Sequence, residues 1–468
     1  MEFEEMEAKA LEAFVSETIK EWKSGPAMVQ AIEQRAYYET DNPDIKKRKK
    51  QYAAGVPDED APGEFRAIAK ENKFAANEKM PSSFFKDITD AKVQYLAGEG
   101  ADVAALNEAG AETVEALYGP LRRQIRRQGQ ACLTDALIYR SAFAYLQIIN
   151  DRPKLTHIDF CEVIPLRNKQ NKLENVIRIY KRGKKEFAEL HTPATVFYLE
   201  ESEEKGGEFK LVSTAPQIIT IKQYGDGTVT PEGGKAWPRL PWFEMQHNND
   251  KTSSLTCSVK GMIRCYDIVS SDFVNNLIDV QDVFVKLKQG YGSGMEYGET
   301  LEMMRIFKAA EDVEGVQTVD VPYQARQVLL DMLTANIYKA LRGVDLTQLR
   351  GGNKTAKEIK AIYSDIDLWA DQAEWHLEDW VLDILETVAA YQETELPEVS
   401  VSFTRRVMFD QTEQMDALAR QKGIISDKTL LENHPLVVNA QAELEQLNAE
   451  ELDAAYSNQS GGGFIGFE

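Results

Sequence analysis

The chain is poor in the side chains from which most catalytic and metal sites are built. Its 468 residues contain four cysteines and five histidines, and none of them falls into a CxxC or HExxH spacing. The cysteines are Cys132, Cys161, Cys257 and Cys265, and the histidines are His157, His191, His247, His376 and His434. Cys257 and Cys265 lie too far apart along a helical pattern to form a disulfide. We therefore predict reduced, mostly buried thiols and no catalytic residue, metal or cofactor.

Long apolar segments are also missing. No run of 18 apolar residues occurs, so we expect no membrane-spanning helix. The acidic start of the chain, Met1–Glu5, lacks the apolar stretch of a signal peptide. The sequence therefore predicts a soluble protein that is made inside a cell.

Basic residues are in the minority. The chain has 54 lysines and arginines against 76 aspartates and glutamates, a formal net charge of −22. A protein that binds nucleic acid tightly normally shows a basic surface, so the charge argues against that class. It is compatible with a surface along which DNA passes without adhering. An apolar fraction of 43% supports packed cores, and the length predicts two to four compact units.

Two glycine-rich segments resemble phosphate-binding loops only superficially. Gly461, Gly463 and Gly466 match a dinucleotide fingerprint, but only two residues follow, so no helix can receive the phosphate. The segment Gly351–Thr355 has asparagine between its glycines and lysine, and no strand leads into it. Neither segment predicts a nucleotide site.

Acidic residues crowd one helical pattern over residues 355–391. They are Asp365, Asp367, Asp371, Glu374, Glu378, Asp379, Asp383 and Glu386. Catalytic carboxylates would have to converge from several elements, whereas these spread around one helix, which favours a solvated acidic face. A metal-dependent hydrolase that uses the acids from Asp365 to Asp383 is the alternative.

Two basic runs, Lys46–Lys50 and Arg122–Arg127, stand out from the acidic background. Such runs are more often solvated patches or partners in salt bridges between subunits. Contact with DNA or with an acidic neighbour is the other reading.

The longest regular pattern covers residues 254–289. Apolar residues recur at three- and four-residue steps, as on one face of a helix. They are Val259, Met262, Ile263, Tyr266, Val269, Phe273, Leu277, Phe284 and Leu287. An unbroken helix of this length would span about 54 Å. One chain can hardly cover so long a stripe, so we expect neighbouring copies to bury it.

The other patterns predict a mixture of helices and antiparallel strands. Helices are expected over 2–23, 27–38, 82–96, 111–144, 299–310, 322–342 and 355–391. Strands are expected over 144–149, 176–180, 195–199, 209–212, 218–221, 316–321 and 399–404.

Several segments, in this order, resemble the portal proteins of tailed bacteriophages, in the branch typical of long-tailed phages. The segments are Asn72–Phe74, Asp90–Gly98, Ala142–Leu146, Val163–Pro165, Ile177–Tyr180, Trp242–Asn249, Val259–Ile263, Tyr266–Ser270, Phe403–Arg406 and Gly423–Leu430, followed by Pro435. The resemblance covers about residues 35 to 450.

The resemblance implies an α+β, mostly helical portal fold. Its parts would be a wing of helices and antiparallel sheet (1–253 and 355–405), stem helices at 254–289 and 321–343, a small α/β clip (290–320), a tunnel loop (344–354) and a helical crown (406–456). Residues 457–468, rich in glycine, are expected to form a disordered tail.

Three groups of residues follow from these parts. The tunnel loop would present Leu346, Leu349, Arg350, Gly351, Gly352 and Lys354 to DNA in the channel. The clip would use Tyr291, Glu296, Tyr297, Glu299 and Arg305 for docking. One side of the second stem helix would carry Ala325, Val328, Leu329, Met332, Ala340 and Leu341 for packing.

The function implied by the resemblance is that of a passive, non-enzymatic gateway for DNA. Portal proteins form rings, usually of twelve copies, at one capsid vertex of the virion and assemble in the host cytoplasm. The implied partners are further copies of the chain, the large terminase subunit, head–tail adaptors, major capsid and scaffolding proteins, and double-stranded DNA held without sequence specificity. Another head–tail connector ring is a further alternative; such a ring would lack the two-helix stem and its clip.

Overall fold

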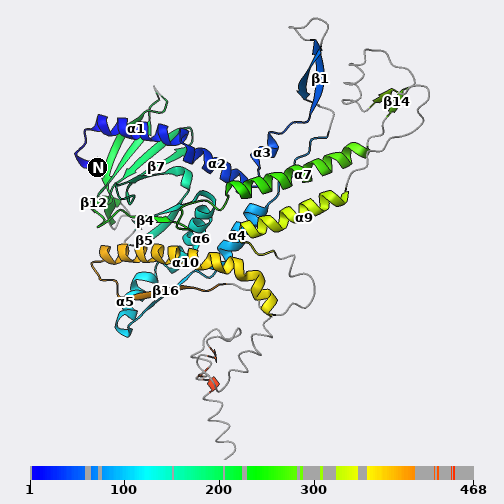
Figure 1. Cartoon of the computed structure of the whole chain (residues 1–468). Coiled ribbons are helices and arrows are strands. Elements are labelled where there is room, and N and C mark those ends of the chain that lie inside the picture. Colours follow the sequence, from blue (N-terminus) through cyan, green and yellow to red (C-terminus); the bar gives the residue numbers. More distant parts are fainter. Residues whose placement is uncertain are drawn as a thin grey trace, which may run out of the picture. The chain divides into compact units, whose positions relative to one another are not determined.

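The computed structural model describes residues 3–57, 65–71, 76–149, 152–203, 206–223, 229–281, 285–287, 306–308, 323–345 and 356–405, and six single residues between 426 and 447. The chain divides into two compact units, residues 1–345 with 364–406 and residues 346–363 with 407–468. Most described residues belong to the first unit. This unit combines helices with mainly antiparallel strand pairs, so the predicted α+β class is confirmed at this level (Figure 1).

A five-stranded antiparallel sheet in the order β10–β9–β8–β7–β6 packs against helix α1 (Figure 1). The strands are β6 (Val163–Arg167), β7 (Leu173–Arg182), β8 (Lys185–His191), β9 (Thr195–Glu201) and β10 (Phe209–Pro216). Helix α1 (Ala8–Ser24) presents Leu11, Val15 and Ile19, four residues apart, to the sheet. The β7 residues Ile177 and Ile179 join this core, because alternate residues of a strand share one face.

A second core lies around a three-stranded antiparallel sheet in the order β13–β4–β5. The strands are β4 (Ala142–Ile149), β5 (Arg152–Ile158) and β13 (Trp242–Met245), and the helices α2 (Pro26–Tyr38), α4 (Phe84–Ala97) and α6 (Arg122–Tyr139) contribute to the core. Tyr145 stacks on Trp242 with ring centroids 4.9 Å apart, and the buried His191 meets both rings edge-on. These aromatic contacts add to the stabilisation from burial.

The prediction of one helix over residues 111–144 is wrong, because this segment forms two helices and the start of a strand. Helix α5 (Ala111–Tyr118) ends before Gly119-Pro120, and α6 begins at Arg122. Proline lacks the amide hydrogen that a helix interior needs and clashes with the preceding turn. Strand β4 begins at Ala142, two residues after Arg140, which caps the end of α6 with a positive φ of 96°.

Helix α6 covers the edge strand β5 with glutamine side chains. Gln124 Oε1 accepts a hydrogen bond from the Leu155 amide (2.8 Å), and Gln128 Oε1 accepts one from the His157 amide (3.0 Å). Residues four apart on the helix thus meet residues two apart on the strand. An exposed strand edge invites pairing with other chains, and these side chains occupy its free amides.

The remaining strands form two-stranded pairs. These are β1 (Gln51–Pro57) with β2 (Phe65–Glu71), β3 (Ala101–Ala105) with β16 (Val399–Phe403), β11 (Ile218–Gln223) with β12 (Val229–Lys235), and β14 (Val285–Leu287) with β15 (Ile306–Lys308). The β14–β15 pair is parallel and the other three are antiparallel. Short helices occur at η1 (Phe3–Glu5), α3 (Pro43–Lys46), η2 (Glu108–Gly110) and η3 (Phe160–Glu162).

Helix α10 (Ala356–Tyr391) agrees with the helix predicted over 355–391. Its Leu377 and Trp380 line, with Ile125 and Gly129 of α6, a cavity of only about 10 Å³, so the two helices are closely packed there. Among the residues that the structure describes, none of the helices combines the length and the hydropathy of a membrane-spanning segment. Cys132 is buried, but Cys257 and Cys265 are exposed, so the prediction of mostly buried thiols is wrong for these two.

Candidate functional site

The two predicted stem helices lie against each other as α7 (Cys257–Gln281) and α9 (Tyr323–Ala340) (Figure 1). Helix α7 is shorter than the predicted 254–289, because Val285–Leu287 forms strand β14. In Val285-Lys286-Leu287-Lys288 apolar and basic residues alternate, which is the period of a strand and not of a helix. The helix predicted over 299–310 is likewise wrong for Ile306–Lys308, which forms strand β15.

One end of the helix pair is anchored in the second core. Val259 and Ile263 of α7, Ile337 of α9 and Leu341, the first residue after α9, are all buried there. Phe84, at the start of α4, contacts both helices. Its ring meets Tyr266 of α7 at 4.9 Å and Tyr338 of α9 at 5.9 Å, both nearly perpendicular.

Beyond this anchor, the buried face of α7 changes from apolar to polar. Asp267, Ser271 and Asn275 continue the four-residue series that starts at Val259 and Ile263, and all three are almost completely buried. Their oxygens accept hydrogen bonds from the backbone amides of Ser82 (2.9 Å), Met80 (3.0 Å) and Glu78 (2.7 Å), respectively. We call this arrangement the α7 ladder.

The α7 ladder holds residues 78–82 along the helix in the opposite chain direction. Asn42 Nδ2 also donates to Asp267 Oδ2 (2.6 Å), and Asn275 Nδ2 donates to the Glu78 carbonyl (3.1 Å). Burial raises the pKa of Asp267, while the hydrogen bonds from Ser82 and Asn42 oppose that rise. Hydrophobic periodicity alone missed these residues; the signal was a four-residue repeat of Asp, Ser and Asn on the core-facing side.

Away from the second core, the helix pair carries large apolar side chains that are exposed in the described part of the chain. Phe273 of α7 contacts Tyr323 (5.9 Å between ring centroids) and lies under the Arg326 guanidinium (5.7 Å). Leu277 and Ile278 of α7 and Tyr323, Val328 and Met332 of α9 have exposed fractions between 41% and 67%. We call these five residues the exposed stem patch. Large apolar side chains that are exposed on both helices favour an interaction surface on this helix pair.

The six residues predicted for stem packing do not share one environment. Val328 and Met332 belong to the exposed stem patch, Ala325 and Ala340 are exposed, and Leu329 is half-buried. Leu341 is 3% exposed and packs in the second core, on the same side of α9 as Leu333 and Ile337. The structure thus separates an inward apolar face of α9 from an outward one.

Helix α9 ends in a hydrogen-bonded cap that fixes where the following loop begins. The Gly343 amide donates to the Tyr338 carbonyl (2.8 Å), and the Arg342 amide donates to the Lys339 carbonyl (3.1 Å), a Schellman motif with Arg342 at φ 51°. A Cβ at Gly343 would lie 2.7 Å from Ile88 Cγ2, so a larger residue there would force the Ile88 side chain to move.

Most residues predicted for the channel and the clip lie outside the described residues. Of the predicted tunnel loop, Val344 and Asp345 are described. The undescribed positions are Leu346, Leu349, Arg350, Gly351, Gly352 and Lys354 of the loop and Tyr291, Glu296, Tyr297, Glu299 and Arg305 of the clip. The predicted crown (406–456) is described only at six single residues, and the predicted tail (457–468) at none.

The acids of α10 are partly neutralised by two arginines. Arg405 pairs with Asp371 (2.6 Å), Glu374 (2.5 Å) and Asp367 (3.6 Å). Arg239 pairs with Asp383 (3.1 Å) and Glu386 (3.5 Å). In the part of the chain that the structure describes, no three His, Cys, Asp or Glu side chains converge as metal ligands do. The geometry therefore gives the hydrolase alternative no support.

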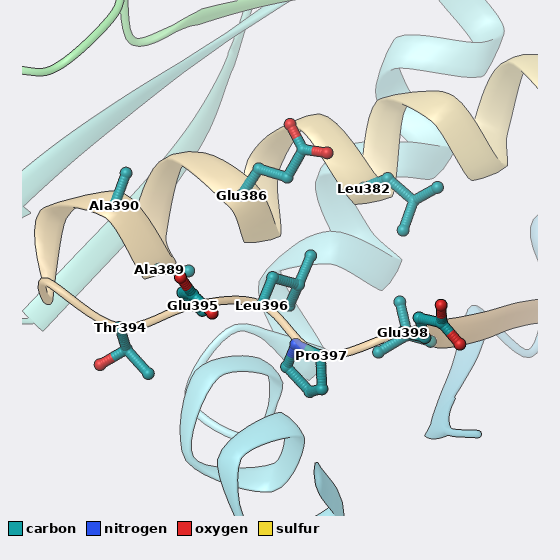
Figure 2. A pocket seen from close by; sticks show the side chains of 10 residues that line it. Leu382, Glu386, Ala389, Ala390, Thr394, Glu395, Leu396, Pro397 and Glu398 are labelled. Atoms are coloured by element: carbon teal, nitrogen blue, oxygen red, sulfur yellow. The ribbon is translucent and has the colours of Figure 1, made fainter. Parts of the chain in front are cut away.

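The C-terminal end of α10 borders a groove of about 530 Å³ (Figure 2). Leu382 and Glu386 of α10 form one side, and Glu395, Pro397 and Glu398 of the following segment form the other. The groove thus combines an apolar lining with carboxylates.

Comparison with known proteins assigns the chain to a family. The profile of the family described as phage portal protein, SPP1 Gp6-like, matches residues 30–456. The chain belongs to this family of phage portal proteins. The resemblance found in the sequence is therefore confirmed over most of the chain.

The chain is also similar to one curated protein and to one solved structure, both less closely than to the family profile. The portal protein of Clostridium phage phiCD119 is 26% identical over 220 residues, which cover 45% of this chain and 48% of that relative. The chain thus spans about half the length of this relative. A solved structure described as the neck of an empty GTA particle, computed with C6 symmetry, aligns with a TM-score of 0.38 at 9% identity, over 75% of this chain and 88% of that one.

Proposed function

We propose that this portal-family chain assembles into a closed ring at a capsid vertex and forms the channel through which DNA enters and leaves the head. The exposed stem patch carries this proposal. Its five large apolar side chains lie on the two helices assigned to the stem, and copies arranged around an axis would bury them against each other. The ring would be a virion component, usually of twelve copies in this family.

The parts of the ring would have separate tasks. Residues 344–354 would meet the DNA, with Arg350 and Lys354 near the phosphates of an otherwise acidic channel. Residues 290–320 would dock the large terminase subunit and the head–tail adaptors. Capsid and scaffolding proteins would contact the outer surface. In a chain of net charge −22, contacts with DNA would be transient and screened by salt.

Charged substitutions in the exposed stem patch test the ring. We expect Val328→Glu with Met332→Glu to leave the fold intact, because both side chains are exposed (67% and 52%), and to reduce assembly because glutamate resists burial. Mass photometry and negative-stain microscopy of purified protein would measure the ring fraction.

The matched control replaces two equally exposed valines elsewhere. Val29→Glu with Val212→Glu changes side chains of α2 and β10 that are 59% and 64% exposed, and should leave the ring fraction unchanged. A wild-type chain that stays monomeric at micromolar concentration would contradict the proposed ring. If the stem variant still forms intact rings, the exposed stem patch is not part of the interface between subunits.

A further inference from the structure

Helix α10 presents a face that combines large apolar side chains with carboxylates. Leu368, Asp371, Trp375, Asp379, Leu382 and Glu386 follow one another at three- and four-residue steps and so lie on one side of the helix. We call them the α10 outer face. Leu368 and Trp375 are 62% and 66% exposed. An exposed tryptophan surrounded by charge has the composition of a binding hot spot.

The charge of this face is only partly compensated within the chain. Asp371 and Glu386 have arginine partners, but Asp379 of this face and Glu378 beside it pair with no lysine or arginine of the described residues. Burial raises the pKa of Glu378, and the neighbouring charges of Glu374 and Asp379 raise it further. Between residues 364 and 391 the helix has no lysine or arginine. A cationic partner would therefore relieve like-charge repulsion.

The groove at the C-terminal end of α10 extends this surface. Leu382 and Glu386 belong to both, and Glu395 and Glu398 add two carboxylates, which form no ion pair with described residues (Figure 2). A partner with guanidinium groups would fit. Arginine stacks on tryptophan and binds carboxylates with two parallel hydrogen bonds, whereas lysine does neither as well.

The chain itself carries a matching surface on α6. Arg123 and Arg127, one helical turn apart, are exposed and form no ion pair with any residue that the structure describes. Their neighbours Arg122 and Arg126 are paired with Glu115 and Glu99. We call Arg123 and Arg127 the α6 basic face.

The two faces point away from each other on one packed pair of helices. Leu377 of α10 and Gly129 of α6 line the tight contact between the helices. At 100° per residue, Trp375 lies about 160° around α10 from Leu377, and Arg127 lies about 160° around α6 from Gly129. The block of α6 and α10 therefore carries opposite charges on opposite sides. Complementary patches on opposite sides of a subunit produce head-to-tail contacts, which can close into rings.

We propose that the α10 outer face of one copy binds the α6 basic face of the next copy, with arginine stacked on Trp375 and paired with the carboxylates around it. This inference rests on the proposed ring and assigns one of its subunit contacts. It adds a contact that is separate from the exposed stem patch.

Charge reversal on each face, alone and combined, tests the contact in the full chain. The α6 variant is Arg123→Glu with Arg127→Glu, and the α10 variant is Glu378→Lys with Asp379→Lys. Each should raise the concentration for half-assembly by about 100-fold, because like charges then face each other. The combination of all four changes restores opposite charges and should recover the rings. Mass photometry over a dilution series would measure assembly, and circular dichroism would check the fold.

The control reverses two lysines in the exposed turn between β6 and β7. Lys169→Glu with Lys172→Glu changes the net charge as much as the α6 variant does and should assemble like the wild type. Rings that persist in either face variant, or a four-fold variant that stays monomeric, would overturn the inference and leave the proposed function intact. Rings that persist while the α6 variant loses DNA binding would assign that face to DNA instead. A monomeric wild type would contradict the proposed function itself.

Discussion

At the residue scale, the least expected side chain is Lys92 of α4. It is 3% exposed, lies 4.8 Å from the Trp369 ring and has no ion-pair partner among the described residues. Burial lowers the pKa of its ammonium to about 7, helped by the charge of Arg342. A lysine in a helical pattern is normally assigned to the surface, so no pattern in the sequence places Lys92 in a core.

We expect Lys92→Met to raise the free energy of unfolding at pH 7, by on the order of 3 kcal/mol. Because the folded-state pKa is below the usual value for lysine, the unfolded chain binds the proton more tightly between about pH 7 and pH 10. The penalty is therefore complete below pH 7 and disappears as the pH rises towards 10. Urea unfolding of wild type and variant at pH 7 and pH 10 would measure this.

The gap in stability between the two proteins should narrow at pH 10. A constant gap would mean that packing, and not the charge, accounts for it. The exposed turn residue Lys169 provides the control, because Lys169→Met should change stability by less than about 0.5 kcal/mol at either pH.

At the element scale, the sequence predicted regular periods well and polar packing poorly. The helix over 355–391 and the strand at Val399 are confirmed because their apolar residues follow one period throughout. In α7 the predicted apolar stripe holds only at its start. Its buried side continues with Asp267, Ser271 and Asn275, which a hydrophobic pattern assigns to solvent. Their partners are backbone amides far away in the sequence, and no local pattern encodes those.

Removing Asp267 tests how strongly the α7 ladder stabilises the unit. Asp267→Ala leaves the Ser82 amide and Asn42 Nδ2 buried without acceptors, so we expect a loss of about 2–3 kcal/mol in the free energy of unfolding. Hydrogen exchange of the Met80 and Ser82 amides should accelerate more than that of the five-stranded sheet. Cys265→Ala, at an exposed position of the same helix, should change neither quantity. Unchanged exchange at residues 78–82 in the Asp267 variant would argue against the ladder.

At the scale of the whole molecule, the family and its architecture class followed from the order of sequence segments. The surface residues that we propose to bind the next copy could not be identified from the sequence in this way. The sequence analysis did not single out Trp375, which is 66% exposed, and it interpreted the arginines of α6 as a solvated run. Both become informative only when the packing of α6 on α10 shows that they face opposite sides.

The net charge predicts how such assembly depends on salt. Copies with a formal charge of −22 repel each other at long range, and this repulsion is screened over about 10 Å at 0.1 M salt. Ion pairs in contact, partly shielded from solvent, are screened less. We expect the ring fraction at fixed protein concentration to rise from about 10 mM to about 150 mM salt, as measured by mass photometry. A steady fall over this range would show that attraction between opposite charges dominates at every distance.

The α7 ladder also limits its own length. Successive acceptors on α7 are four residues apart, which is about 6.0 Å along a helix, whereas donors two residues apart in an extended chain are separated by about 6.6 Å. The two spacings therefore differ by about 0.6 Å for each added hydrogen bond. Over three hydrogen bonds the accumulated mismatch stays within the range of hydrogen-bond lengths, and over a longer series it would not. Only one alignment of residues 78–82 along α7 therefore allows all three hydrogen bonds. A shift of one residue would break all three. The strand pair β1–β2 that precedes residues 78–82 is therefore tethered at a single position along α7.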